Sequence, residues 1–187
     1  MIGQTLVPLG QLKDLDSELH ATQRDKYVGR EAVLDYRVSL LGCGFLDAVH
    51  CSPVHPHWIY RARCEAGIDV PTGSPHGWGV GLAFEIPVER ISINRAAWYA
   101  WCAPWLNGYP GEDVATEPPS EEFEEFDPDR YAPLADVPEL HRRYLARMTQ
   151  LHQRALTFVH IPHVLVAGPI DVSGCRIVRW EEPPPAL

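Results

Sequence analysis

The sequence lacks several features that would assign it to a familiar class of protein. It has no apolar run of 18 residues, so we expect no transmembrane helix. Its start, MIGQTLVPLGQLKD, has no basic stretch followed by a long apolar core, so we expect no signal peptide. The five cysteines are odd in number and form no CxxC pair. This argues against a disulfide framework and favours a reducing, cytoplasmic setting.

Sequence motifs of common enzymes are also missing. The chain has no GxxxxGK[ST], no GxSxG and no HExxH motif. The sequence therefore does not indicate a phosphate-binding loop, the nucleophile elbow of α/β-hydrolases or the zinc site of a zincin. The net charge is −9, and residues 112–129 hold nine acids and no base, so the other 16 acids balance the 16 bases. A near-neutral body does not favour broad nucleic-acid binding, although a local basic groove stays open.

What the chain does contain suits one domain over residues 1–187. The 187 residues are 45% hydrophobic, enough for a sizeable core, and 18 prolines indicate many loops and turns. Residues 107–136 are acidic and rich in proline, which predicts an exposed insertion. Residues 181–187, EEPPPAL, predict a frayed tail.

Hydrophobic patterns along the chain alternate between helical and strand spacing. The mixture, with long loops, predicts an α+β fold rather than regular βαβ repeats. Asn94 and Asp136 are the predicted N-caps of the last two helices. The expected strands span residues 4–7, 35–40, 45–51, 80–88, 158–166 and 175–180, and the expected helices span residues 9–27, 58–66, 95–105 and 136–157.

The segment 41–67 is the strongest candidate for a functional site. A short apolar strand ends at Ser52-Pro53, and a helix follows that should stop at Gly67. Strand alternation puts His50 and Cys51 on opposite faces, so one of them faces the core and the other a cleft or solvent. A lone histidine beside apolar residues is more often structural, but Ser52 and His55 nearby strengthen the functional case.

A metal site in the same segment is an alternative. His50, Cys51, His55 and His57 are residue types that zinc accepts, and a metal-dependent hydrolase could use them. However, Pro56 lies between His55 and His57 at the start of the helix, which disrupts chelation by the pair. We therefore assign no metal ligands.

Two segments resemble one family of enzymes. AVHCSP (48–53), followed by a helix and Gly67, is similar to the "VHLS…A…G" segment of the RNA 2′-phosphotransferases, within the ADP-ribosyltransferase superfamily. The strand at 81–88 lies where that family has a strand, and HVLVAGPI (163–170) resembles its late strand.

The resemblance implies an ADP-ribosyltransferase-like fold of split mixed and antiparallel sheets with flanking helices. It also implies NAD as the cofactor and small-molecule nucleotide partner, with transfer or glycohydrolysis at the nicotinamide ribose C1′. The implied catalytic residues are His50 and His163. The implied cofactor-binding residues are Ser52, His55, Tyr60 and Arg61.

The chain departs from the family at two positions. Thr5-Leu6-Val7 stands where the family's first strand carries a His or Arg, and position 163 holds His where toxin-type transferases often have Glu. These departures leave a catalytically inactive binding module of the same fold as a second alternative.

Overall fold

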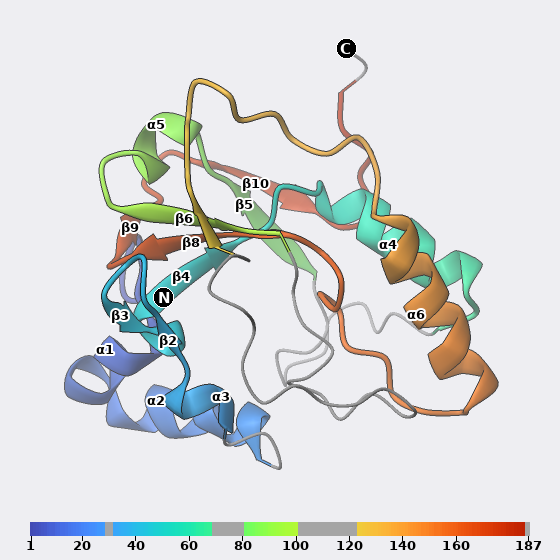
Figure 1. The fold of residues 1–187 in the computed structure, drawn as a ribbon, viewed down its shortest axis with the longest axis horizontal. Helices are drawn as coiled ribbons and strands as arrows, with labels where there is room; N and C mark the ends of the chain where they lie inside the picture. Colours follow the sequence, from blue (N-terminus) through green and yellow to red (C-terminus); the bar gives the residue numbers. More distant parts are fainter. Residues whose placement is uncertain (29–31, 69–80, 101–122, 186–187) are drawn as a thin grey trace.

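A four-stranded antiparallel sheet in the order β4-β8-β6-β7 lies at the centre of the molecule (Figure 1). The computed structural model describes residues 1–28, 32–68, 81–100 and 123–185. The first part of the chain forms β1 (Thr5–Leu6), α1 (Leu9–Leu15), α2 (Ser17–Arg24), the 3-10 turn η1 (Asp25–Tyr27), α3 (Ala32–Asp35), β2 (Arg37–Val38), β3 (Cys43–Gly44), the 3-10 turn η2 (Phe45–Asp47), β4 (Ala48–Cys51) and α4 (Pro56–Glu65). The later part forms β5 (Leu82–Glu85), α5 (Val88–Ile91), β6 (Ala96–Tyr99), β7 (Phe123–Glu125), α6 (Glu139–Gln150), β8 (His163–Ala167), β9 (Ile170–Asp171) and β10 (Arg176–Arg179).

The register of the sheet decides which side chains share a face. Strand β8 pairs with β4, where His50 lies opposite Leu165, and with β6, where Tyr99 lies opposite His163. Paired residues, and residues two apart on one strand, point to the same face. His50, His163 and Tyr99 therefore share a face, and Cys51 lies on the other. The prediction that His50 and Cys51 face opposite sides is confirmed.

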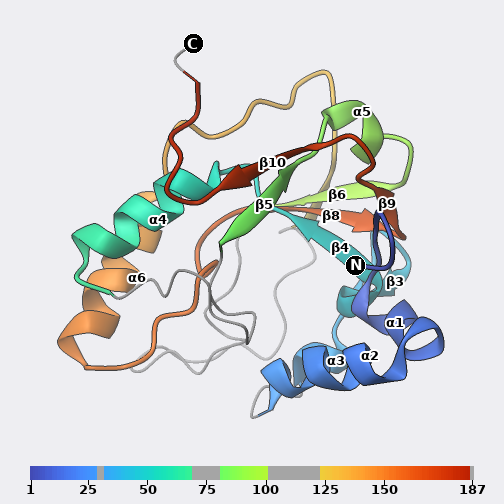
Figure 2. The same cartoon turned by 180° about the vertical axis from the view of Figure 1, so that it is seen from behind.

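Different parts of the chain cover the two faces. The segment 36–45 packs on the face that carries His50. On the opposite face the paired strands β5 and β10 lie over the sheet, as Figure 2 shows from behind. The hydrophobic cluster on the face that carries His50 contains the buried residues Tyr36, Val38, Leu41, Phe45, Ala48, Ala97, Tyr99, Phe123 and Leu165. The hydrophobic cluster on the opposite face contains the buried residues Val49, Ile91, Phe126, Val164, Val166, Ile170 and Val172, and the partly buried Phe84 and Ile86 pack against them.

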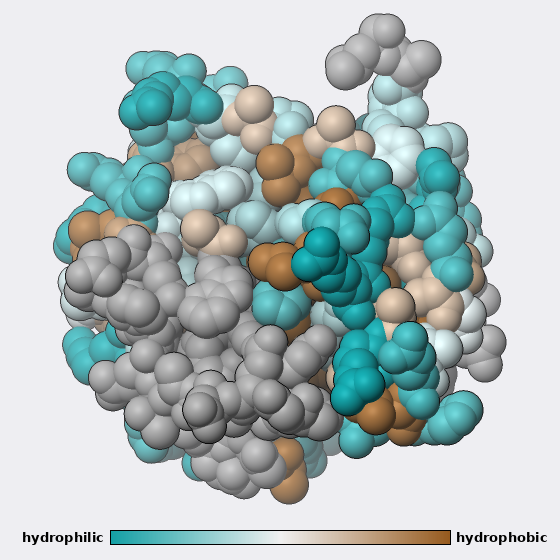
Figure 3. All heavy atoms as spheres, turned by 45° about the vertical axis from the view of Figure 1, so that its right-hand side comes forward, coloured by the Kyte–Doolittle hydropathy of each residue, from teal (hydrophilic) through white to brown (hydrophobic). Residues whose placement is uncertain are grey.

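Helices α4 and α6 form a third group at the side of the sheet (Figure 1). Tyr144, Leu145 and Met148 on α6 are buried against α4, whereas Arg143 and Arg147 are exposed. This spacing of three and four residues gives α6 an apolar and a polar side. Figure 3, turned to bring this side of the molecule forward, shows hydrophilic side chains with smaller hydrophobic patches between them.

The predicted helix over 95–105 is wrong in its described part, where Ala96–Tyr99 form strand β6. Asn94 does not cap a helix, because a strand follows it; its Nδ2 instead donates to the Pro169 carbonyl oxygen at 3.3 Å. The strand pairs with β8 on one side and β7 on the other. This cross-strand pairing outweighs the helical spacing of the tryptophans. Residues 101–105 lie outside the described residues.

Two other predicted helices are shorter than expected. The helix over 9–27 is divided at Asp16, whose Oδ1 accepts a hydrogen bond from the Leu19 backbone N–H at 2.9 Å and caps α2. The helix over 136–157 is α6 alone, because Pro138 precedes it and His152, with φ 52°, leaves the helical conformation after it. Asp136 is not its N-cap. The prediction for α4 is confirmed, since Gly67 follows its end with φ 72°.

The predicted strands agree more closely, but two of them begin later than expected. The strand over 45–51 begins at Ala48, because Phe45–Asp47 form the 3-10 turn η2. The strand over 158–166 begins only at His163, because the Ile161 N–H bonds to the Phe158 carbonyl in a turn. Within the predicted insertion, residues 107–122 lie outside the described residues, but Phe123–Glu125 form edge strand β7. Phe123 and Phe126 are buried, whereas Glu124 and Glu125 are exposed. Glu124 and Glu125 therefore reach solvent from a strand that the buried Phe123 and Phe126 hold in place.

The α+β class is confirmed by the mixture of helices and small antiparallel sheets. Within the described ranges, none of the helices has the length and apolar character needed to cross a membrane.

Candidate functional site

The two catalytic candidates meet at one end of the neighbouring strands β4 and β8 of the central sheet. The ring centroids of His50 and His163 are 5.9 Å apart, with their planes at 75°. His50 comes from the end of β4 and His163 from the start of β8, and antiparallel pairing brings these strand ends together. The Phe45 ring lies 4.3 Å from His50, and the Phe158 ring lies 5.7 Å from His163. The structure thus joins two segments that the sequence separates widely.

Each imidazole has one nitrogen bonded to a backbone carbonyl. His50 Nε2 lies 2.8 Å from the Phe45 oxygen, and His163 Nδ1 lies 2.8 Å from the Ile161 oxygen. A carbonyl oxygen only accepts, so each of these nitrogens carries the hydrogen and donates it. In the neutral ring the other nitrogen keeps a lone pair. Neither His50 Nδ1 nor His163 Nε2 has a hydrogen-bond partner among the described residues.

The surroundings keep both rings neutral. His163 is buried, and its pKa is lowered to about 3. Loss of water is the main cause, the neighbouring His50 adds to the shift, and the bond to Ile161 opposes it. His50 keeps an exposed side, yet the protein packed around its inner side removes water and lowers its pKa as well. At neutral pH the pair therefore offers two hydrogen-bond acceptors and no positive charge.

Aromatic residues that the sequence analysis missed surround the pair. Tyr99 lies opposite His163 in the sheet, and its ring stacks on Phe123 with centroids 4.8 Å apart. Phe45 and Phe158 each precede their histidine by five residues. This repeated spacing is the one sequence signal that could have identified them. Together these rings make one side of the site rigid and apolar.

Ser52 and His55, both predicted to bind the cofactor, hold the turn between β4 and α4. The Ser52 hydroxyl donates to the Val54 carbonyl at 3.3 Å and accepts from the Val54 N–H at 3.1 Å. His55 is the N-cap of α4, and its Nδ1 accepts from the His57 N–H at 3.3 Å. His55 Nε2 is buried without a partner among the described residues. These contacts fix the path of the chain just after His50.

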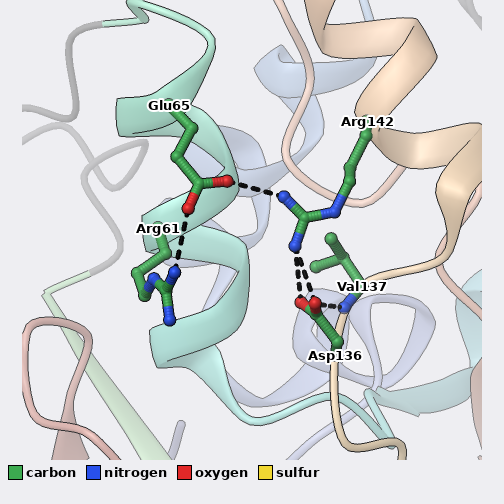
Figure 4. Close-up of polar contacts among 5 residues, drawn as sticks. All are labelled: Arg61, Glu65, Asp136, Val137 and Arg142. Carbon is green, nitrogen blue, oxygen red and sulfur yellow. Dashed lines mark hydrogen bonds and ion pairs between the residues drawn. The ribbon is translucent and has the colours of Figure 1, made fainter.

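Tyr60 and Arg61, the other predicted cofactor-binding residues, have their contacts within the helical group. The Tyr60 ring lies 6.4 Å, between centroids, from the ring of His57 on the same helix. The Arg61 guanidinium lies 5.5 Å from the centroid of the Trp58 ring and donates to Glu65 at 3.0 Å. Figure 4 shows that Glu65 also accepts from Arg142 of α6. These contacts bring Tyr60 and Arg61 next to α4 and α6 residues rather than next to the imidazole pair.

Potential metal ligands do not cluster in the described ranges, which contain no group of three or more His, Cys, Asp or Glu side chains able to hold an ion. The chain was compared with protein-family models, with curated proteins and with solved structures, and none of them matches it.

Proposed function

We propose that the chain binds a nucleotide of the NAD class and acts as an ADP-ribosyltransferase-like enzyme, in transfer or glycohydrolysis at the nicotinamide ribose C1′. The observation that supports this most is the adjacent pair of neutral imidazoles, His50 and His163. Each has one nitrogen that no other described residue engages and that can accept a hydrogen bond. The proposal gives these two residues the central role.

The two acceptor nitrogens suit the hydroxyl groups of a ribose. The 2′ and 3′ hydroxyls of a ribose each have one hydrogen to donate, and a neutral imidazole nitrogen accepts one hydrogen bond. The backbone carbonyls of Phe45 and Ile161 fix the orientation of the rings before any ligand arrives. Groups held in place in this way lose little freedom on binding, which favours both affinity and catalysis.

The lowered pKa values suit the reaction. The C1′–N bond breaks, nicotinamide leaves with the bonding electron pair, and the ribose develops oxocarbenium-like positive charge before water or an acceptor adds. A protonated imidazole beside that charge would repel it. Burial keeps His163 neutral far below neutral pH. The pair can therefore hold the ribose without opposing the transition state.

Release of free nicotinamide from NAD, followed by chromatography, tests this function. We expect the wild-type protein to release nicotinamide, and His50→Ala and His163→Ala to lower the rate about 10²-fold, as the loss of one positioned polar group does elsewhere. His152 is exposed, so His152→Asn is the matched control and should keep the full rate. A folded wild-type protein that gives neither nicotinamide nor a heat of binding with NAD would refute the proposal.

A catalytically inactive nucleotide-binding module is the second candidate. Two observations favour it: His occupies position 163, and no carboxylate among the described residues contributes to the pKa shifts of the pair. Saturable heat of binding with ADP-ribose and no nicotinamide release would select this candidate over the enzyme. A metal-dependent hydrolase gains no support from the described residues.

A further inference from the structure

A cavity of about 530 Å³ lies at the opposite end of β6 from the imidazole pair. Its lining comes from the turn after β2, the loop before β6 and the end of β7, and includes Leu40, Ile93, Arg95, Glu125 and Phe126. Tyr99, at the other end of β6, lies opposite His163. The volume falls in the range of small-molecule sites.

The cavity contains two opposite charges that do not pair with each other. Glu125 lies opposite Ala97, and the Phe126 N–H bonds to the Ala96 carbonyl, so Arg95 and Glu125 point to the same face of the sheet. Arg95 donates to the Leu40 carbonyl oxygen. Neither Arg95 nor Glu125 forms an ion pair within the part of the chain that the structure describes. A guanidinium and a carboxylate are thus both available on one wall.

Apolar side chains beside these charges are open to solvent. Ile93 is 81% exposed, the highest value among the large hydrophobic residues described, and Leu40 is 36% exposed. Both line the cavity. Covering them would remove apolar surface from water, which is favourable.

We propose that this cavity binds a small zwitterion that carries an apolar group, of which a free aliphatic amino acid is the simplest example. The ligand carboxylate accepts from Arg95, since the guanidinium donors match paired oxygens. The ligand ammonium donates to Glu125. The apolar side chain packs on Ile93 and Leu40. This site is separate from the imidazole pair and does not depend on the proposed function.

Binding of leucine measured by calorimetry tests the proposal, with two analogues as comparisons. The acid 4-methylpentanoate lacks the ammonium group, and 3-methylbutylamine lacks the carboxylate. We expect leucine to bind saturably and each analogue to bind about tenfold more weakly or worse, because each loses one charged hydrogen bond. Arg95→Gln and Glu125→Gln should each weaken leucine binding by a similar factor.

Two charge-matched variants serve as controls. Glu124 alternates with Glu125 on β7 and points to the other face, and Arg130 is exposed beyond the cavity lining. Glu124→Gln and Arg130→Gln should leave leucine binding unchanged. If Arg95→Gln fails to fold because its bond to Leu40 is lost, Glu125→Gln still decides, since no hydrogen bond or ion pair joins Glu125 to another described side chain. No saturable binding of leucine, or equal binding by Glu125→Gln, would overturn the proposal.

Discussion

His163 and His141 are buried histidines whose surroundings disfavour the positively charged form of the ring. His141 Nδ1 donates to the Val159 carbonyl oxygen at 2.6 Å, and burial lowers its pKa to about 4. His163 Nδ1 donates to the Ile161 oxygen, and burial lowers its pKa to about 3. In an unfolded chain both would titrate near about 6.5. Folding therefore favours the neutral form of both side chains.

This difference predicts that acid destabilises the protein well above the range in which carboxylates titrate. Below about pH 6.5 both histidines become protonated in the unfolded state but stay neutral in the folded state. The free energy of unfolding therefore falls as the pH is lowered. The stabilisation is complete above the unfolded pKa and is lost towards the folded pKa values of about 3 and 4. Urea denaturation at pH 7.5 and pH 5 should show a loss of about 2 kcal/mol for each residue.

A His163→Gln variant isolates one of the two contributions. Because glutamine does not titrate, this variant should lose about 2 kcal/mol less than wild type between pH 7.5 and pH 5. The comparison uses the change between the two pH values, since lost packing lowers stability at both. His152→Asn, on the surface, should match wild type. An unchanged pH dependence in His163→Gln would show that His163 takes up its proton in the folded state.

At the scale of the elements, Arg142 connects α4 to the segment before α6. It donates to Glu65 at 2.6 Å and to Asp136 at 2.7 Å, and it is 33% exposed (Figure 4). Asp136 Oδ1 also accepts from the Val137 N–H at 2.7 Å. Solvent screens such contacts, but one guanidinium here restrains two segments at once.

We predict that Arg142→Ala lowers the thermal midpoint by about 1–3 °C, because surface ion pairs contribute little individually. Arg143→Ala is the control, since the ion pair that Arg143 forms among the described residues is with Glu139 on its own helix, and Arg143 is largely exposed. It should leave the midpoint unchanged within error in a calorimetric scan. Equal effects of the two substitutions would mean that the link between α4 and α6 residues adds nothing.

Local signals in the sequence identify some elements well and others poorly. α4 follows from Pro56 in its first turn and from Gly67, a residue suited to the positive φ after the helix. β6 does not follow, because Trp98, Trp101 and Trp105 fit helical spacing, and only pairing with β8 and β7 makes the segment a strand. β7 could not be predicted either, because it lies in an acidic, proline-rich stretch and forms only by pairing with β6. Strands that form only by pairing with distant segments cannot be predicted from their own residues.

At the scale of the whole molecule, the same limit applies to the candidate site. His50 could be selected from its place at the end of a predicted strand, whereas His163 was selected through the family resemblance. The register places His50 opposite Leu165, 115 residues further along the chain. Neither that register nor the burial that lowers the pKa of His163 can be predicted from local sequence patterns. It also gave no sign of the cavity at Arg95, since that segment was predicted to be helical. The two proposed sites lie at opposite ends of β6.

The central claim is that His50 and His163 together accept hydrogen bonds from one ribose. Long-range nitrogen–proton NMR spectra of the histidine rings, recorded during a titration with ADP-ribose, test it most directly. We predict that free His50 carries its hydrogen on Nε2 and free His163 on Nδ1, and that His50 Nδ1 and His163 Nε2 then shift together with a single saturation curve. Unchanged resonances for both nitrogens at saturating ADP-ribose, or shifts confined to other histidines, would contradict the claim.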